Sequence, residues 1–118
     1  MPTLRSITPL LPAGPDLASA LSFYVDRMGF TVTWQADGMA GVARDDIAFN
    51  LVESDDRVWA ENTSLSIGVS DLDRLYEEYR SIPANVGALE MKAWGRREFH
   101  MIVESGVCLQ FYEQGSRK

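Results

Sequence analysis

The sequence predicts an α+β protein built from two consecutive βαβββ modules. Short β-branched stretches and stretches with helical spacing of apolar residues follow the order strand, helix and three strands, and this order occurs twice. The aspartates expected to open the two helices, Asp16 and Asp71, lie 55 positions apart (71 − 16). The closing strands match at an offset of 60 (109 − 49), residues 49–51 against residues 109–111. At 118 residues the chain is expected to form one domain, with modules over residues 5–53 and 64–114.

The first module is expected to contain one helix and four strands. Asp16 can cap the helix by accepting a hydrogen bond from its first turn, and Gly29 can end it. The polar run of residues 54–62 is expected to be a connecting loop. The expected strands are residues 5–11, 30–35, 40–44 and 47–53.

The second module repeats this pattern. Ser70 is expected to cap its helix, with acidic residues in the first turn where the helix dipole favours them, and Pro83 is expected to stop it. The expected strands are residues 65–69, 89–92, 97–103 and 107–113.

Composition narrows the possible functions. The net charge of −6 and the pI of about 4.6 argue against binding to nucleic acid, which requires a basic face. The acid excess either serves solubility or attracts a cationic ligand. No stretch has the roughly 18 to 20 apolar residues of a membrane span. The single cysteine, Cys108, cannot form an intramolecular disulfide, and the N-terminus lacks the pattern of a signal peptide, so we expect a cytoplasmic protein.

Strand alternation separates two faces of the predicted sheets. Residues such as Phe49, Leu51, Leu109 and Phe111 form an apolar face suited to packing beneath the helices. The opposite face is smaller and more polar, as the floor of a binding site should be, although an ordinary solvent-facing surface would show the same alternation. The site residues predicted on that face are Ala48, Asn50, Ser64, Ser66, Cys108, Gln110 and Tyr112.

Three tryptophans complete the predicted binding site. Trp34 ends the expected second strand, Trp59 lies in the polar loop, and Trp94 precedes a strand. Aromatic walls with a few polar groups suit a flat or cationic small molecule. Trp34 and Trp94 could instead close the core or contact a second subunit, and Trp59 could contact a ligand or a partner subunit.

No catalytic residue is assigned from the sequence. Glu98, within an Arg-Arg-Glu run, is expected to form ion pairs on a strand edge rather than to act as an acid or base. His100 has no nucleophile placed beside it, so we interpret it as structural. Cys108 is interpreted as a small apolar lining residue, because no basic group that would lower its pKa is apparent nearby.

Several short motifs resemble the vicinal oxygen chelate (glyoxalase/bleomycin resistance/dioxygenase) superfamily. In the first half these are Asp16, the pair Phe23-Tyr24 and the ending Gly29-Phe30. The run from Trp94 to Phe99 is similar to the bleomycin-resistance branch in particular. One departure is the last turn, where Glu-Ser-Gly-Val at residues 104–107 replaces the usual Asp-Pro-x-Gly-Asn.

The resemblance implies a half-barrel from each module, a ligand-binding cleft and a homodimer. Metal-dependent members of the superfamily carry ligands at four strand positions, which correspond here to Pro9, Asn50, Ser64 and Gln110. Proline has no side-chain donor and neutral serine and asparagine are weak ligands, so no metal or other cofactor is expected.

Two classes of function therefore remain. The first is a small-molecule binding protein that resembles bleomycin resistance proteins and sequesters an antibiotic or metabolite in a metal-free cleft. A module that senses a metabolite for a partner protein belongs to the same class. The second is an enzyme, a metal-dependent lyase or dioxygenase of the superfamily, and the four ligand positions argue against it.

Overall fold

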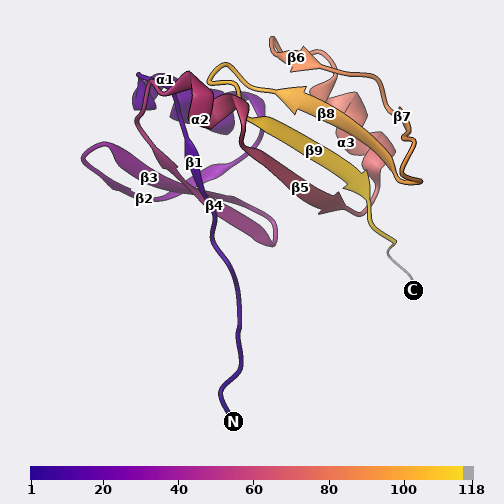
Figure 1. Cartoon of the computed structure of the whole chain (residues 1–118), viewed down its shortest axis with the longest axis horizontal. Coiled ribbons are helices and arrows are strands. Elements are labelled where there is room, and N and C mark those ends of the chain that lie inside the picture. Colours follow the sequence, from indigo (N-terminus) through magenta and orange to yellow (C-terminus); the bar gives the residue numbers. More distant parts are fainter. Residues whose placement is uncertain (116–118) are drawn as a thin grey trace. The chain divides into compact units, whose positions relative to one another are not determined.

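The computed structural model describes residues 1–115, which fold as two compact units, Met1–Asp56 and a second unit that begins at Arg57. Each unit contains one open β-sheet and short helices, as the labels in Figure 1 show. The predicted α+β class is therefore confirmed, and each predicted module of one helix and its strands falls within one unit.

In the first unit the sheet has the strand order β1-β4-β3-β2. Strands β1 and β4 pair in parallel, whereas β4, β3 and β2 pair antiparallel along the chain. The elements are β1 (Leu10–Pro12), α1 (Leu17–Ser22), the π-helical turn η1 (Phe23–Arg27), β2 (Thr31–Ala36), β3 (Met39–Arg44) and β4 (Ile47–Val52).

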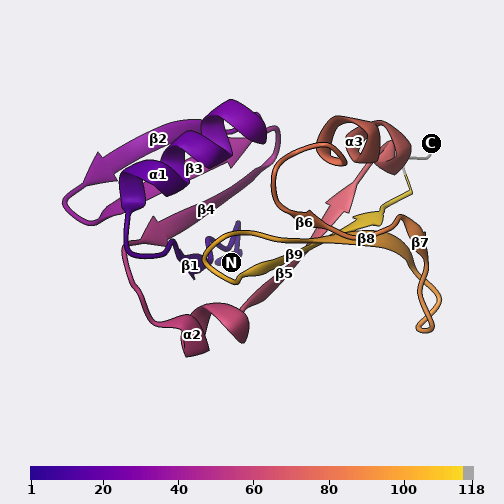
Figure 2. The same ribbon diagram turned by 90° about the horizontal axis from the view of Figure 1, so that it is seen from above.

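The predicted helix start at Asp16 is confirmed. The Asp16 carboxylate accepts a hydrogen bond from the Ser19 N–H at 3.2 Å, which satisfies one of the donors that the first turn leaves free. Glu53 strengthens this end by accepting from the Leu17 N–H at 3.0 Å. Figure 2 shows α1 running across one face of the unit's own sheet. There Tyr24 meets Phe49 edge to face, with ring centroids 5.5 Å apart.

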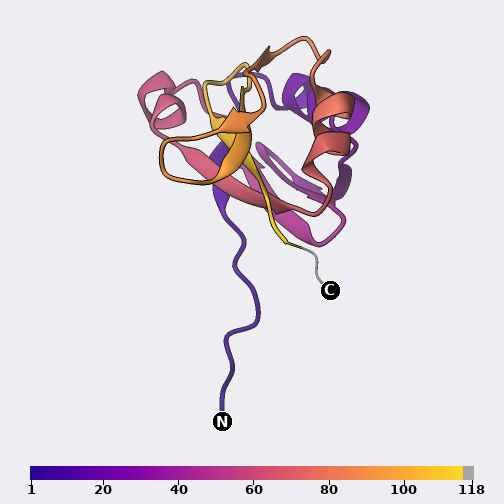
Figure 3. The same cartoon turned by 90° about the vertical axis from the view of Figure 1, so that its right-hand side faces the viewer.

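The predicted strand over residues 5–11 is wrong over most of its length. Pairing with β4 extends only from Leu10 to Pro12, preceded by a hydrogen bond from the Asn50 N–H to the Pro9 carbonyl at 2.8 Å. Pro9 has no N–H to donate, so the parallel ladder stops there. Residues 1–8 are exposed and run away from this sheet (Figure 3).

In the second unit the sheet has the order β5-β9-β8-β6, and β7 also pairs with β8. Strands β5 and β9 pair in parallel, and α3 covers one face, where Tyr76 packs against Phe99 and Tyr79 against Phe111. The elements are α2 (Arg57–Glu61), β5 (Ser64–Val69), α3 (Leu72–Tyr79), β6 (Asn85–Val86), β7 (Glu90–Met91), β8 (Arg97–Ile102) and β9 (Cys108–Glu113).

Three local predictions for this part of the chain are wrong. The expected loop over residues 54–62 contains helix α2, in which Arg57 and Glu61 pair at 3.1 Å and Ala60 is buried. The cap of α3 is Asp71 rather than Ser70, because the Asp71 side chain accepts from the Arg74 N–H. The expected strand over residues 89–92 is reduced to the two-residue strand β7, and a second short strand that the sequence did not predict, β6, precedes it.

The predicted alternation of faces is confirmed. Phe49 and Leu51 in the first unit and Leu109 and Phe111 in the second are buried. Their neighbours along each strand point the other way and are half-buried or exposed. Each sheet therefore has one face that packs beneath a helix and one face without a helix of its own unit.

Candidate functional site

The candidate site is a polar cluster on the face of the second unit's sheet that is opposite α3. Phe99 and Phe111 pack against α3, so the alternate residues of β8 and β9 point to the other side. Two rows of residues cross β5, β9 and β8 on this side: Ser66, Gln110 and His100 in one row, and Gly68, Tyr112 and Glu98 in the next.

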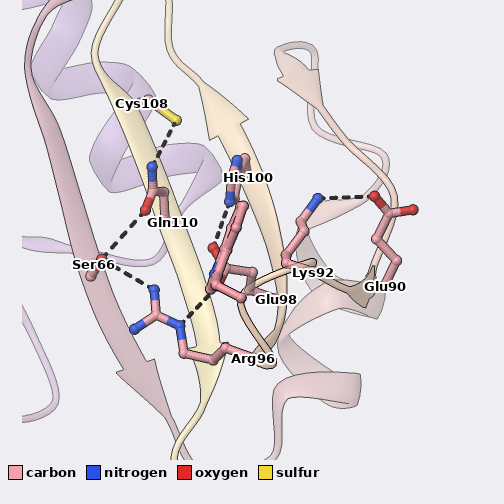
Figure 4. A network of polar contacts seen from close by, with 9 residues as sticks. Ser66, Glu90, Lys92, Arg96, Glu98, His100, Cys108 and Gln110 are labelled. Carbon is pink, nitrogen blue, oxygen red and sulfur yellow. Dashed lines mark hydrogen bonds and ion pairs between the residues drawn. The ribbon is translucent and has the colours of Figure 1, made fainter.

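Glu98 is the centre of the cluster, with its side chain 0% exposed. Its Oε2 accepts hydrogen bonds from Arg96 Nε at 2.8 Å and from Trp94 Nε1 at 2.9 Å, and its Oε1 is 2.6 Å from His100 Nε2 (Figure 4). Burial alone would raise the pKa of Glu98, but the hydrogen bonds from Arg96, His100 and Trp94 outweigh it and lower the pKa to about 2. The carboxylate is therefore ionised at neutral pH and acts only as an acceptor.

A tight turn between β7 and β8 brings Trp94 and Arg96 onto this face. The Lys92 N–H donates to the Arg96 carbonyl at 3.0 Å, and the Gly95 N–H donates to the Lys92 carbonyl at 2.9 Å. Gly95 adopts φ +87°, a left-handed conformation that glycine takes without steric cost. The turn thereby places two donors within reach of a carboxylate on the strand that follows.

The donors around Glu98 also form two stacked pairs. The Trp94 indole lies nearly parallel to the His100 ring, with centroids 6.4 Å apart and 18° between the planes. The Arg96 guanidinium lies 3.9 Å from the centroid of the Tyr112 ring, within the range of a cation–π interaction. Because Trp94 remains 63% exposed, its indole can still take part in stacking with a flat ligand.

Polar groups continue across the face from Arg96. Arg96 Nη2 donates to Ser66 Oγ at 3.3 Å, and Ser66 Oγ donates in turn to Gln110 Oε1 at 3.4 Å. Gln110 Nε2 lies 3.9 Å from the sulfur of Cys108, which is consistent with Cys108 as a lining residue. Five of the predicted site residues are thus brought together on one face: Ser66, Trp94, Cys108, Gln110 and Tyr112.

The other predicted residues of the second unit lie farther from the cluster. Ser64 is on the same face, at the end of β5, and pairs with Cys108 rather than with Gln110. Trp59 lies on α2 and is 38% exposed, and its carbonyl accepts from the Thr63 hydroxyl at 2.7 Å. The expected loop position of Trp59 is therefore wrong, because the residue belongs to a helix.

In the first unit, Trp34, Gly41 and Asn50 form one row across β2, β3 and β4. The indole of Trp34 lies directly on the backbone of Gly41, since a Cβ at that glycine would be 2.2 Å from Trp34 Nε1. Ala48 follows on the same face of β4 and is exposed. This face offers an aromatic ring and one amide.

Sequence reasoning did not assign Arg96, Glu98 or His100 to the site. The strand-edge position expected for Glu98 is wrong, because β8 lies between β9 and the short strands β6 and β7. The ion pair itself is present, between Arg96 and Glu98. The alternation of side chains along β8 could have placed Glu98 and His100 on the binding face. These residues pair with Tyr112 and Gln110 of β9, which had been assigned to that face from the sequence.

The four positions that carry metal ligands in part of the superfamily do not fit a metal here. Pro9 offers no side-chain donor, and the β5 residue opposite Gln110 is Ser66, whose hydroxyl is hydrogen-bonded to Gln110 itself. Within residues 1–115, no group of three or more His, Cys, Asp or Glu side chains is arranged to hold a metal ion. In the same part of the chain, no helix has the length and apolar character needed to cross a membrane.

Comparison with known proteins places these features in context. A family model described as "Glyoxalase/Bleomycin resistance protein/Dioxygenase superfamily" matches residues 7–113. A bleomycin resistance protein of Geobacillus stearothermophilus is 27% identical over an alignment of 132 positions, which covers 94% of this chain and 97% of the relative. A bleomycin resistance protein of Staphylococcus aureus gives the same values.

Solved structures show the same similarity. The bleomycin-binding protein from bleomycin-producing Streptomyces verticillus, in complex with copper(II)-bleomycin, has a TM-score of 0.86 and 28% identity, over 98% of this chain and 100% of that one. A bleomycin resistance determinant encoded on the transposon Tn5 has a TM-score of 0.83 over 96% of this chain and 100% of that one, and at 22% identity it supports the fold alone.

Proposed function

Because the chain belongs to the glyoxalase/bleomycin resistance protein/dioxygenase superfamily, we propose that it is a non-enzymatic binding protein that sequesters an antibiotic of the bleomycin type or a related metabolite. The observation that carries this proposal is the aromatic and polar face of the second unit, in which an exposed Trp94 is held beside His100 and Arg96. The bleomycin resistance relatives and the bleomycin-bound structure, each similar over nearly the whole chain, support the ligand class.

The chemistry of the cluster favours binding over catalysis. A carboxylate with a pKa of about 2 that already accepts three hydrogen bonds is a poor general base at neutral pH. The positions that hold the metal of the superfamily's lyases and dioxygenases carry Pro9, Asn50 and serine in place of strong ligands. We therefore propose that the protein acts by stoichiometric capture, without a cofactor.

The proposed ligand is flat and cationic. The exposed indoles suit a flat or cationic group, and the net charge of −6 attracts a cation at long range. The one carboxylate within the cluster is neutralised by Arg96, so the attraction comes from the rest of the chain and salt should weaken it. The proposed contacts in the second unit are Trp59, Ser64, Ser66, Trp94, Cys108, Gln110 and Tyr112, and those on the first unit's sheet are Trp34, Ala48 and Asn50.

We also propose that residues 1–118 act as a single domain and that the protein is a cytoplasmic homodimer. Strand β2 is an edge of its sheet and all six of its residues are exposed, so a second copy could cover it. Light scattering at micromolar concentration should give twice the chain mass of 13.2 kDa. A monomer mass would argue against the dimer, and recovery of the protein outside the cytoplasmic fraction would argue against the location.

The test of binding is a calorimetric titration with bleomycin, both metal-free and as the copper(II) complex. We expect saturation at one molecule per site and a parallel change in tryptophan fluorescence. A simple polyamine serves as the control for charge alone and should not saturate the aromatic face. If neither form of bleomycin saturates the protein at millimolar concentration, the proposal of bleomycin-type sequestration is wrong.

A further inference from the structure

We propose that Glu98 is a positioning residue, which holds Trp94, Arg96 and His100 as a preformed ligand platform and presents His100 Nδ1 as a hydrogen-bond acceptor. This inference rests on the proposed function and deepens it, because it assigns how the binding face is organised. Three hydrogen bonds of 2.6 to 2.9 Å, from three different side chains, converge on this one carboxylate.

The carboxylate connects groups that lie on two different segments of the chain. Trp94 and Arg96 come from the turn before β8, whereas His100 and Glu98 belong to β8 itself. An indole that is 63% exposed has little packing to fix its orientation, so its hydrogen bond to Glu98 and its stacking on His100, which Glu98 also holds, restrain it. A ligand that finds the ring already in place avoids the entropy cost of ordering it.

The same carboxylate determines which nitrogen of His100 carries the proton. An ionised carboxylate has no proton to donate, so the 2.6 Å contact requires that Nε2–H is the donor. In the neutral ring Nδ1 then has a free lone pair, and the geometry of imidazole directs it away from Glu98 (Figure 4). Among residues 1–115 the structure records no hydrogen bond to that nitrogen.

These two effects define a chemical class of ligand. The aromatic part would be a flat heterocycle that stacks on the indole of Trp94. The edge of that heterocycle, or the group attached to it, would carry an N–H or O–H that donates to His100 Nδ1. Without Glu98 the imidazole would populate both tautomers, and in one of them Nδ1 would be a donor instead of an acceptor.

The test compares Glu98→Gln with the matched control Glu90→Gln. Glu90 of β7 pairs with Glu98 of β8 and accepts from Lys92 at 3.0 Å, so its replacement removes the same charge from a neighbouring position and leaves the three hydrogen bonds of Glu98 in place. His100 is the only histidine of the chain, so its ring nitrogens give a single set of 15N NMR signals that needs no assignment. Spectra at pH 8 should show the Nε2–H tautomer in the parent and in Glu90→Gln, and a mixture of tautomers in Glu98→Gln.

Affinity provides the second measurement. Glu98→Gln should bind bleomycin at least about tenfold more weakly, because the amide cannot accept from all three donors, while Glu90→Gln should bind as the parent does. An unchanged tautomer together with unchanged affinity in Glu98→Gln would overturn the inference. An Nδ1–H tautomer in the parent would overturn it without any variant, which covers the case in which Glu98→Gln does not fold. If the parent does not bind bleomycin, the proposed function fails, and the tautomer spectra still decide whether Glu98 positions His100.

Discussion

Replacing Glu98 with Gln should remove a contribution to stability that depends on pH in a defined way. In the unfolded chain this carboxyl has its ordinary pKa of 4.5. In the folded protein burial raises the pKa, but the hydrogen bonds from Arg96, His100 and Trp94 outweigh burial and lower the pKa to about 2. A pKa that is lower in the folded state means that the ionised group stabilises the fold above pH 4.5, and that this contribution is lost as the pH falls through 2. The difference between the two pKa values corresponds to about 3 kcal/mol.

Urea unfolding between pH 5 and pH 2, followed by tryptophan fluorescence, measures this contribution. The window begins at pH 5 to stay below the range in which histidine side chains ordinarily change charge. All other carboxylates are common to the parent and Glu98→Gln, so their titration cancels in the difference of unfolding free energies. We expect that difference to shrink by up to about 3 kcal/mol as the pH falls.

Glu90→Gln is again the control, because its carboxylate is 58% exposed and its pair with Lys92 lies on the surface. Its unfolding free energy should differ from that of the parent by less than about 1 kcal/mol at every pH. If the difference between the parent and Glu98→Gln stays constant from pH 5 to pH 2, the carboxylate is not held ionised by its three donors and the reasoning fails.

Three further outcomes are expected. Gly41→Ala should destabilise the protein by about 1 to 3 kcal/mol and shift the fluorescence of Trp34, because the new Cβ would lie 2.2 Å from the indole nitrogen; an unchanged denaturation curve would contradict this packing. Asp16→Ala should cost about 1 kcal/mol in urea unfolding through loss of the helix cap, and a loss below the error of the measurement would argue against the cap. Trp94→Ala should weaken bleomycin binding by roughly 1 to 3 kcal/mol, and equal affinity of this variant and the parent by calorimetry would remove Trp94 from the site. Trp59→Ala should keep its fold, because Trp59 is 38% exposed.

Features with a local cause could be predicted from the sequence. The Asp16 cap and the glycine that follows the first helix are read from neighbouring residues, and the structure confirms the cap. The strand over residues 5–9 could not be predicted correctly, because a strand needs a partner as well as a suitable composition. Helix α2 was missed because residues 57–61 carry no apolar stripe, and the segment is held by an ion pair and the burial of Ala60.

The candidate site also contains a part that could be predicted from the sequence and a part that could not. Alternation placed Ser66, Gln110 and Tyr112 on one face, and the register of β5 and β9 agrees with this. It could not reveal that the turn at Gly95 folds an indole and a guanidinium back onto Glu98, since that depends on the conformation of a loop. A buried carboxylate was therefore interpreted as a surface ion pair.

The parallel pairing of β5 with β9, and of β1 with β4, has a consequence for how the chain reaches its structure. Ser64 pairs with Cys108, 44 positions later (108 − 64), and Leu10 pairs with Asn50, 40 positions later (50 − 10). Loops of this length must close before the contacts form, and proteins dominated by such distant contacts fold slowly. During synthesis β5 leaves the ribosome long before β9. The backbone donors and acceptors of β5 that face β9 therefore stay unpaired while nearly the whole second unit is being made. In the growing chain, the strand that carries Ser66 is thus the segment most in need of protection from aggregation.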